Sequence, residues 1–423
     1  MATVRNSDKI PAHLPKRLTI SFPTFGLYDT ESGGVYHDVD RVVREHKERG
    51  FNCIRMDDGA GLIHDLDGNL RGPIPIGYIF GEHDKALRQF GVNGDPGLCD
   101  PHARLIEYFE AAKKYDVYII LSAWYYLHTC WLVKDRALNR ELHELPPLER
   151  FGAFAKFLHY IIADLEARGL ADRIAFAEIF NEADGLYFVN GYGANGLSDE
   201  EIAPFREKHE EAIAWLKEQH PNILFAFDSY TYRTDLRQAP KNMQLYNFHS
   251  YFLWAPLYGN MLEKDHSFVK EKVTMEELRA MADSDYLPDA GWYRRAWFYS
   301  NLDPEKIPEA EKKMNDTLKE HMGEFRERFR ASLDILKNNL ENELPPVPVV
   351  CGEGVAYSGG YSLLWEEKSE EYWTIIKEMM EGYREMGLWG TIVRTCCGPE
   401  DPVWHMCPDK LLEMNKIFLG EDA

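Results

Sequence analysis

Two glutamates stand where a buried strand would deliver its last side chain to a pocket. Glu182 closes the segment Ile-Ala-Phe-Ala-Glu-Ile-Phe-Asn-Glu that starts at residue 174, and Glu353 follows the apolar run Val-Pro-Val-Val-Cys-Gly that starts at residue 347. One carboxylic acid can protonate a leaving oxygen while a second, ionised carboxylate faces the reacting carbon. If the fold brings the two together, the pair fits the cleavage of glycosidic bonds.

Apolar, strand-like runs alternate with amphipathic stretches along the chain. We expect strands at residues 18–22, 51–56, 117–124, 174–180, 223–227, 244–249, 347–351 and 390–395. Helices are expected near residues 38–49, 100–115, 148–168, 198–219, 309–339, 366–386 and 409–418. Continuous apolar strands separated by helices indicate a parallel sheet covered on its outer face. Eight βα units predict an α/β fold, one (β/α)8 TIM barrel over residues 1–423.

Two long insertions interrupt the βα pattern, at about residues 57–97 and 251–308. Both follow strands, so we expect them at the C-terminal face of the barrel, where long loops shape a pocket. The segment Asp65-Leu-Asp-Gly-Asn-Leu70 partly matches a calcium loop, but the ligand pattern does not continue. We therefore interpret it as a hairpin turn.

Composition limits the classes of function. The net charge of −22 disfavours nucleic acid, anionic membranes and polyanionic polymers as partners, so a neutral substrate fits better. No apolar run reaches the ~18 residues of a membrane span, and the N-terminal residues lack the apolar region of a secretory signal. The seven cysteines, most of them in apolar strands, are typical of buried thiols in a reducing compartment. We therefore expect a cytoplasmic protein.

With these residues in place, the chain resembles the retaining barrel enzymes of glycoside hydrolase clan A, in particular the cellulase-like family 5. Four motifs carry the resemblance, in the order that the family shows. They are the strand-two segment around Arg55, the pair Asn181-Glu182 after strand four, His249-Ser-Tyr251 after strand six, and Glu353 after strand seven.

The resemblance implies a role for each of these residues. Glu182 would be the acid/base and Glu353 the nucleophile of a retaining hydrolase that cleaves β-linked neutral oligosaccharides or glycosides. Their carboxyl groups should then lie roughly 5–5.5 Å apart. Arg55 would keep Glu353 ionised. Three further residues would support the site: Asn181 at a sugar 2-hydroxyl, Tyr251 by a hydrogen bond to Glu353, and His249 along the wall.

Two departures from the family pattern bear on the substrate. The third strand ends in Ser122-Ala-Trp124, where many members carry a histidine, and the eighth strand lacks a tryptophan that Trp404 would replace from the following loop. We expect Trp124, Trp254 and Trp404 as binding surfaces for sugar rings, with packing in the core as an equal alternative for each.

Several alternatives stay open at this stage. Glu178 faces the same way as Glu182 but lies deeper, and is interpreted as buried polar packing or as a residue that supports the catalytic groups from behind. Asp184 and Asp228 are candidates for contacts with a sugar. We expect no cofactor and no metal, a carbohydrate as partner, and neither nucleic acid nor a membrane; assembly into a homo-oligomer is left open. The competing functions are a catalytically inactive sugar-binding barrel of the cellulase type and a barrel hydrolase with a non-sugar substrate.

Overall fold

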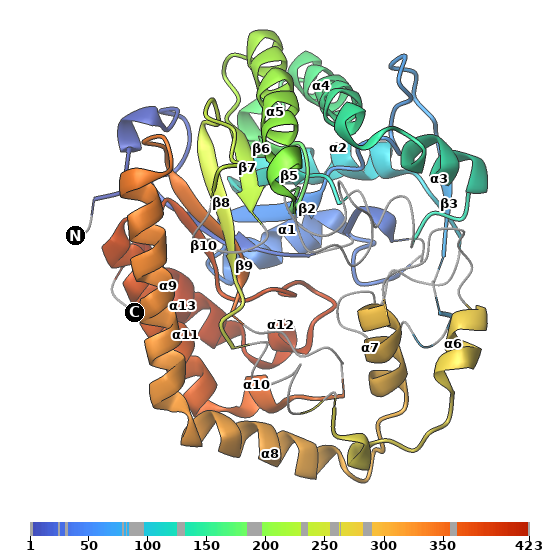
Figure 1. The fold of residues 1–423 in the computed structure, drawn as a ribbon, viewed down its shortest axis with the longest axis vertical. Coiled ribbons are helices and arrows are strands. Elements are labelled where there is room, and N and C mark those ends of the chain that lie inside the picture. Colours follow the sequence, from blue (N-terminus) through green and yellow to red (C-terminus); the bar gives the residue numbers. More distant parts are fainter. Residues whose placement is uncertain are drawn as a thin grey trace.

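Parallel strands close into a barrel at the centre of the molecule (Figure 1). The structure is a computed structural model and describes residues 3–23, 26–29, 33–77, 80–81, 83, 97–124, 132–183, 197–229, 236–253, 262, 264–281, 290–355 and 362–421. The barrel strands are β1 (Leu18–Ser21), β2 (Cys53–Asp57), β5 (Tyr118–Ser122), β6 (Ile174–Glu178), β7 (Phe225–Ser229), β8 (Leu245–Ser250), β9 (Val349–Gly354) and β10 (Gly390–Ile392).

The pairing of these strands closes the barrel without an open edge. Their order is β1-β10-β9-β8-β7-β6-β5-β2, and every neighbouring pair is parallel. Each predicted strand overlaps one of the eight observed strands, so the predicted fold class, a (β/α)8 barrel, is confirmed. Because the strands are parallel, all their C-terminal ends meet at one mouth.

Long helices pack against the outside of the barrel. They are α1 (Val39–Glu48), α2 (Pro101–Tyr115), α4 (Arg150–Ala167), α5 (Asp199–Gln219), α9 (Met322–Asn342), α11 (Glu370–Met386) and α13 (Pro408–Leu419). Their starts follow the expected capping chemistry: the Asp100 side chain accepts a hydrogen bond from the Ala103 amide ahead of α2, and Ser198 and Glu201 form a capping box at α5. In Figure 1, α4 and α5 lie on one side of the strands, and α9, α11 and α13 on another.

One prediction about helices needs correction. The single helix expected at residues 309–339 is divided into α8 (Ile307–Glu320) and α9, because the backbone at His321 leaves the helical region with φ −107° and ψ 16°. This division does not affect how the strands pair.

Small elements lie in the loops around the barrel. The antiparallel pair β3 (Ile74–Ile76) and β4 (Gly97–Cys99) belongs to the first insertion, and the helices α6 (Met275–Met281) and α7 (Ala290–Ser300) belong to the second. The helices α3 (Arg136–His143), α10 (Trp365–Lys368) and α12 (Pro402–Met406) lie in other loops. The Asp65 carboxylate accepts hydrogen bonds from the backbone amides of Asp67 and Asn69, which confirms the predicted hairpin turn. Within the described parts of the chain, no helix has both the length and the apolar character needed to cross a bilayer.

The barrel interior is apolar at one end and polar at the other. Its lower part is a cluster of buried apolar residues that includes Cys53, Ile120, Phe176, Ala226, Leu245 and Trp389. Side chains alternate along a strand, so the residue two positions later points inward again, one layer closer to the mouth. In five strands that residue is polar or charged and fully or almost fully buried: Arg55, Ser122, Glu178, Asp228 and Asn247.

Candidate active site

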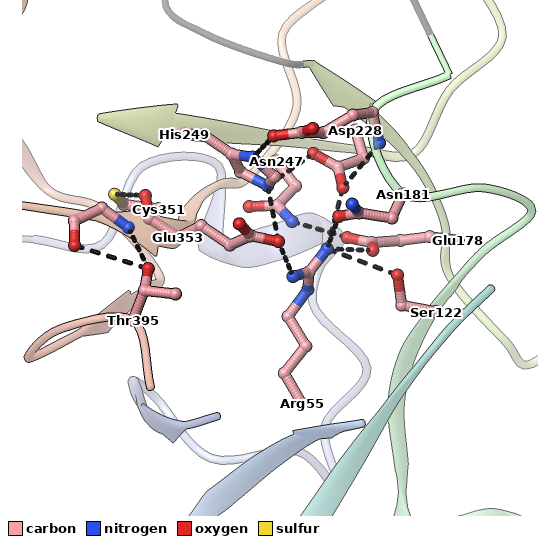
Figure 2. A network of polar contacts seen from close by, with 12 residues as sticks. Arg55, Ser122, Glu178, Asn181, Asp228, Asn247, His249, Cys351, Glu353 and Thr395 are labelled. Atoms are coloured by element: carbon pink, nitrogen blue, oxygen red, sulfur yellow. Dashed lines mark hydrogen bonds and ion pairs between the residues drawn. The ribbon is translucent and has the colours of Figure 1, made fainter. Parts of the chain in front are cut away.

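Arg55 is the centre of the polar layer, and no part of its side chain is exposed. Its Nη1 donates to Glu353 Oε1 at 2.7 Å. Its Nη2 contacts Glu178 Oε2 at 2.9 Å, Asp228 Oδ2 at 2.8 Å and Asn181 Oδ1 at 2.7 Å. Figure 2 shows the guanidinium between Glu353 on one side and the other three acceptors on the opposite side. One cation therefore joins strands β2, β6, β7 and β9 at the mouth.

The charges around Arg55 hold it in its cationic form. Burial would lower the pKa of the guanidinium, but the carboxylates of Glu178, Asp228 and Glu353 outweigh burial and raise that pKa above its ordinary value. Burial raises the pKa of Glu178 to about 6, although Arg55 opposes this change. Removing one member of such a cluster leaves the others buried without compensation, which is far costlier than losing a surface ion pair.

Glu353 is held at both carboxylate oxygens. Arg55 binds Oε1, and the Tyr251 hydroxyl donates to Oε2 at 2.6 Å. Both hydrogen bonds that we expected to Glu353 are therefore present. The backbone amide of Val355 donates to the Ser250 carbonyl at 2.7 Å, which ties the segment that carries Tyr251 to the end of β9. The two hydrogen bonds, one of them from a cation, fix the direction of this carboxylate.

Glu182 lies beyond β6 rather than on it, because the strand ends at Glu178. Its backbone has φ 52°, in the left-handed region that non-glycine residues adopt mainly at turns and functional sites. The Glu182 Oε1 lies 2.5 Å from His249 Nδ1. Burial raises the pKa of Glu182 to about 7; His249 opposes the rise, and the charges of Glu353 and Asp228 add to it. Its environment thus differs strongly from that of Glu353.

The two glutamates face one another across the mouth. One oxygen of Glu182, one oxygen of Glu353 and a ring nitrogen of His249 all lie within 4.8 Å of one another. His249 and Glu353 are also paired in register on the neighbouring strands β8 and β9. This group is close enough to chelate a cation, but both ring nitrogens of His249 already face carboxylates. We assign no metal to it.

The structure brings most of the predicted site residues together. Arg55, Asn181, Glu182, His249, Tyr251 and Glu353 are joined by direct contacts. Trp124 is 2% exposed and packs at this cluster, because the Arg55 guanidinium lies 5.1 Å from its ring centre. The amide oxygen of Asn181 accepts from Arg55, so this residue is part of the arginine cluster as well as a candidate for sugar binding. Trp254 and Asp184 lie outside the described residues.

Trp404 is the predicted site residue that lies elsewhere. It is fully buried at α12, stacks on Phe51 with ring centres 5.9 Å apart, and donates from Nε1 to Glu45 of α1 at 2.9 Å. The Arg49 guanidinium covers the ring at 4.4 Å. An aromatic surface for a sugar needs an open face, and the contacts of Trp404 place it in the core under α1. We do not include it in the proposed site.

Sequence reasoning gave too little weight to several residues of the cluster. Asp228 was expected only as a contact for a sugar, yet it bonds Arg55 and lies 3.0 Å from His249 Nε2. Asn247 Nδ2 donates to Glu178 Oε1 at 2.6 Å, and Thr395 Oγ1 lies 3.1 Å from the Tyr251 hydroxyl. The signal for Asp228 and Asn247 was in the sequence: each follows an inward apolar residue by two positions in a buried strand.

Comparisons with known proteins identify the fold. No family model and no curated protein matches the chain. Among solved structures, an inferred glycoside hydrolase from Parabacteroides distasonis has a TM-score of 0.64 and 17% identity over 95% of this chain and 93% of its own. A broad-specificity endoglucanase of glycoside hydrolase family 5, subfamily 4, from an uncultured bacterium has a TM-score of 0.52 and 11% identity over 95% and 94%.

A third solved structure agrees with these two. It is a glycoside hydrolase family 5 enzyme from Prevotella bryantii, with a TM-score of 0.50 and 11% identity over 99% of this chain and all of its own. The structures that share this barrel therefore include enzymes of the family that the motifs resemble. At these identities the likeness establishes the fold.

Proposed function

We propose that the protein is a retaining glycoside hydrolase that cleaves β-linked neutral oligosaccharides or glycosides. The observation that carries the proposal is the approach of Glu182 and Glu353, with oxygens within 4.8 Å, at the mouth of the barrel. Carboxyl groups roughly 5–5.5 Å apart act by double displacement, whereas inverting pairs are roughly 6.5–9.5 Å apart to leave room for a water. The short approach supports retention.

The environments of the two glutamates assign their roles. Glu353 accepts hydrogen bonds from Arg55 and Tyr251, which favour a carboxylate that is ionised and aimed, as a nucleophile must be. The pKa of Glu182 is raised to about 7, so this group can hold a proton near neutral pH and also release it. Two carboxyl groups in such different environments at one site support a nucleophile beside an acid/base.

The reaction then follows in two steps. Glu353 attacks the anomeric carbon while Glu182 gives its proton to the glycosidic oxygen, so that the bond to the leaving sugar breaks and a covalent glycosyl-enzyme forms. A water then attacks the anomeric carbon from the side that the leaving group vacated. Glu182, now a carboxylate, takes a proton from that water as the bond to Glu353 breaks. Both residues return to their starting states.

The substrate class rests on charge and on the family resemblance. A net charge of −22 would repel polyanionic chains, and the fold neighbours named as glycoside hydrolases and an endoglucanase support a carbohydrate substrate. The rival reading, an inactive sugar-binding barrel, requires loss of the catalytic pair. Both glutamates and the side chains that hold them are in place, so hydrolysis is the stronger proposal.

Product stereochemistry in azide-rescued variants tests the roles. Glu353→Gly should abolish turnover, and azide should then attack from the vacated side and give a glycosyl azide of inverted configuration. Glu182→Ala should still form the glycosyl-enzyme from aryl glycosides with good leaving groups, which need little protonation, and azide should then give a retained product. NMR of the products distinguishes the two. The opposite pattern would reverse the roles, and wild-type rates in both variants would rule out catalysis by either residue.

A further inference from the structure

His249 has carboxyl groups near both of its ring nitrogens, one at Nδ1 and two at Nε2. Its Nδ1 lies 2.5 Å from Glu182 Oε1, and its Nε2 lies 3.0 Å from Asp228 Oδ1 and 3.7 Å from Glu353 Oε1. The side chains of His249 and Asp228 have no exposed surface. The closest approach at Nε2 is therefore an ion-pair contact with Asp228, made away from bulk water.

When Glu182 is ionised, as it mostly is above pH 7, this geometry favours the doubly protonated ring. A neutral imidazole carries one N–H, so one ring nitrogen would then turn its lone pair toward a carboxylate oxygen. The doubly protonated ring presents an N–H to each side. Burial would lower the pKa of His249, but the charges of Asp228, Glu353 and Glu182 outweigh burial and raise that pKa well above its ordinary value.

The remaining polar groups around the ring do not change this balance. Tyr251 lies edge-on to it, with ring centres 6.4 Å apart, and its hydroxyl is used by Glu353. Among the described residues, Arg55 is the other cation bonded to the same carboxylates, and it binds the Oδ2 oxygen of Asp228, so that Oδ1 faces His249. The groups that face the imidazole from β6, β7 and β9 are thus all carboxyl groups.

Asp228 also contacts both halves of the proposed catalytic pair. Its Oδ2 accepts from Arg55 at 2.8 Å, and Arg55 binds Glu353. The same oxygen accepts from the backbone amide of Glu182 at 3.3 Å, at the residue whose φ is 52°. The Asp228 carboxylate therefore contacts Arg55, which binds Glu353, and His249, which binds Glu182. It also accepts a hydrogen bond from the backbone of Glu182.

We propose that Asp228 is a positioning residue that holds His249 as the imidazolium, so that a cation faces Glu182 in both steps of the reaction. This inference rests on the proposed function, because it assigns Glu182 the acid/base role. A cation at 2.5 Å stabilises the carboxylate that forms when Glu182 gives up its proton. It therefore strengthens Glu182 as an acid and keeps it available as a base for the water of the second step.

The change Asp228→Asn should convert His249 from the doubly protonated ring to the neutral imidazole. The Asn side chain can keep an oxygen toward Arg55 and the Glu182 amide, but it then turns an N–H₂ donor toward His249 Nε2. The ring must accept there, which leaves a neutral imidazole with its proton on Nδ1. Glu182 loses the facing cation, whose effect on it exceeds that of Asp228, so the pKa of Glu182 should rise. We expect the alkaline limb of kcat/KM to move to higher pH by roughly one unit.

The matched control is Glu178→Gln, which removes one charge from the same cluster. Glu178 contacts Arg55 Nη2 at 2.9 Å and Asn247 Nδ2 at 2.6 Å, and it forms no hydrogen bond or ion pair with His249. Loss of its charge should leave His249 doubly protonated. A difference between the two variants separates the specific effect of Asp228 from a general change in the charge of the barrel.

Nitrogen NMR of the full chain with ¹⁵N-labelled histidine tests the inference. The His249 signals are identified by their loss in His249→Gln, and spectra are compared at pH 7.5 for the wild type, Asp228→Asn and Glu178→Gln. We expect two protonated ring nitrogens in the wild type and in Glu178→Gln, and one in Asp228→Asn. A doubly protonated ring in Asp228→Asn would overturn the inference.

The wild type alone keeps the inference testable if Asp228→Asn does not fold. A neutral His249 in the wild type at pH 7.5 would overturn the inference whatever the variants do. The protonation of the ring is read without substrate, so inactivity of the wild type on every glycoside would count against the proposed function and leave the inference standing.

Discussion

Tyr251 and Glu353 are joined by a hydrogen bond of 2.6 Å from the phenol to the carboxylate oxygen that Arg55 does not bind. Tyr251 directly follows β8, and Glu353 lies on the neighbouring strand β9. The hydrogen bond between them fixes the direction in which the Oε1 oxygen of Glu353 can face a substrate. A hydrogen bond to a charged group contributes about 1.5–3 kcal/mol. The phenol therefore matters to the rate only if Glu353 takes part in the chemistry.

Tyr251→Phe should lower kcat/KM on aryl β-glycosides by roughly 10- to 100-fold, because the bond that it removes orients the nucleophile. Thermal unfolding should change little, since the ring remains. The control is Tyr160→Phe in α4, which removes the hydroxyl that donates to the Leu66 carbonyl, far from Glu353 in the fold. An equal loss of rate in both variants would show that the effect is not specific to the site.

The alkaline limb of the pH–rate profile should report Glu182. A general acid works only while protonated, and the pKa of Glu182 is raised to about 7, so kcat/KM for substrates with poor leaving groups should fall as pH rises through about 7. Substrates with good leaving groups should depend less on pH in the first step. Glu182→Gln should still cleave substrates with good leaving groups, and its kcat/KM for them should no longer fall at alkaline pH. If the fall persists in this variant, it reports the titration of another group.

Arg55→Met should destabilise the fold by about 3–5 kcal/mol, since it leaves three buried carboxylates without their cation. Burial raises the pKa of Glu178 to about 6 even though Arg55 opposes the rise, so that pKa should rise further without the cation. The variant should therefore be most stable at low pH and lose stability as pH rises from the pKa of an unfolded glutamate through about 6. Urea unfolding at pH 5 and pH 8 measures this.

The control for Arg55 is Arg326→Met. Arg326 pairs with Glu378 at 2.6 Å on the surface, and the loss of a solvent-screened pair should cost about 1 kcal/mol or less. A similar cost for both arginines would mean that the central cluster is better hydrated than its burial indicates.

Trp404→Ala should cost about 3–5 kcal/mol of stability, as expected for a large core side chain, while KM for soluble oligosaccharides stays unchanged. The gentler Trp404→Phe loses the bond to Glu45 and should give a smaller loss of stability with the same KM. A raised KM with unchanged stability would instead restore Trp404 to the sugar-binding surface.

The strands were predictable because fully buried barrel strands are continuous apolar runs, as in residues 117–124. The pairing partners were not, because register depends on contacts between segments far apart in sequence. Arg55 and Glu353 were brought together only by the resemblance to a known family. Asp228 and Asn247 differ from ordinary surface residues only because their side chains point into the barrel. The sequence alone does not say which face of each strand points inward.

The break at His321 and the turn that carries Glu182 were also beyond the sequence pattern. In both segments the residue types resemble those of the preceding helix or strand. The sequence pattern therefore continues past the residue at which the regular backbone conformation ends. Tertiary packing decides such positions. The burial of Trp404 was hidden for the same reason, since a tryptophan near a barrel mouth fits a sugar surface and a core equally well.

Among the described residues, the polar layer carries an excess of negative charge. Four carboxyl groups, those of Glu178, Glu182, Asp228 and Glu353, share one guanidinium and one imidazole. Such a field disfavours any anion and stabilises a carbon that becomes oxocarbenium-like as its bond to oxygen breaks. The same imbalance should make protonated iminosugars bind more tightly than the uncharged sugars that they mimic, a preference that calorimetry can measure directly.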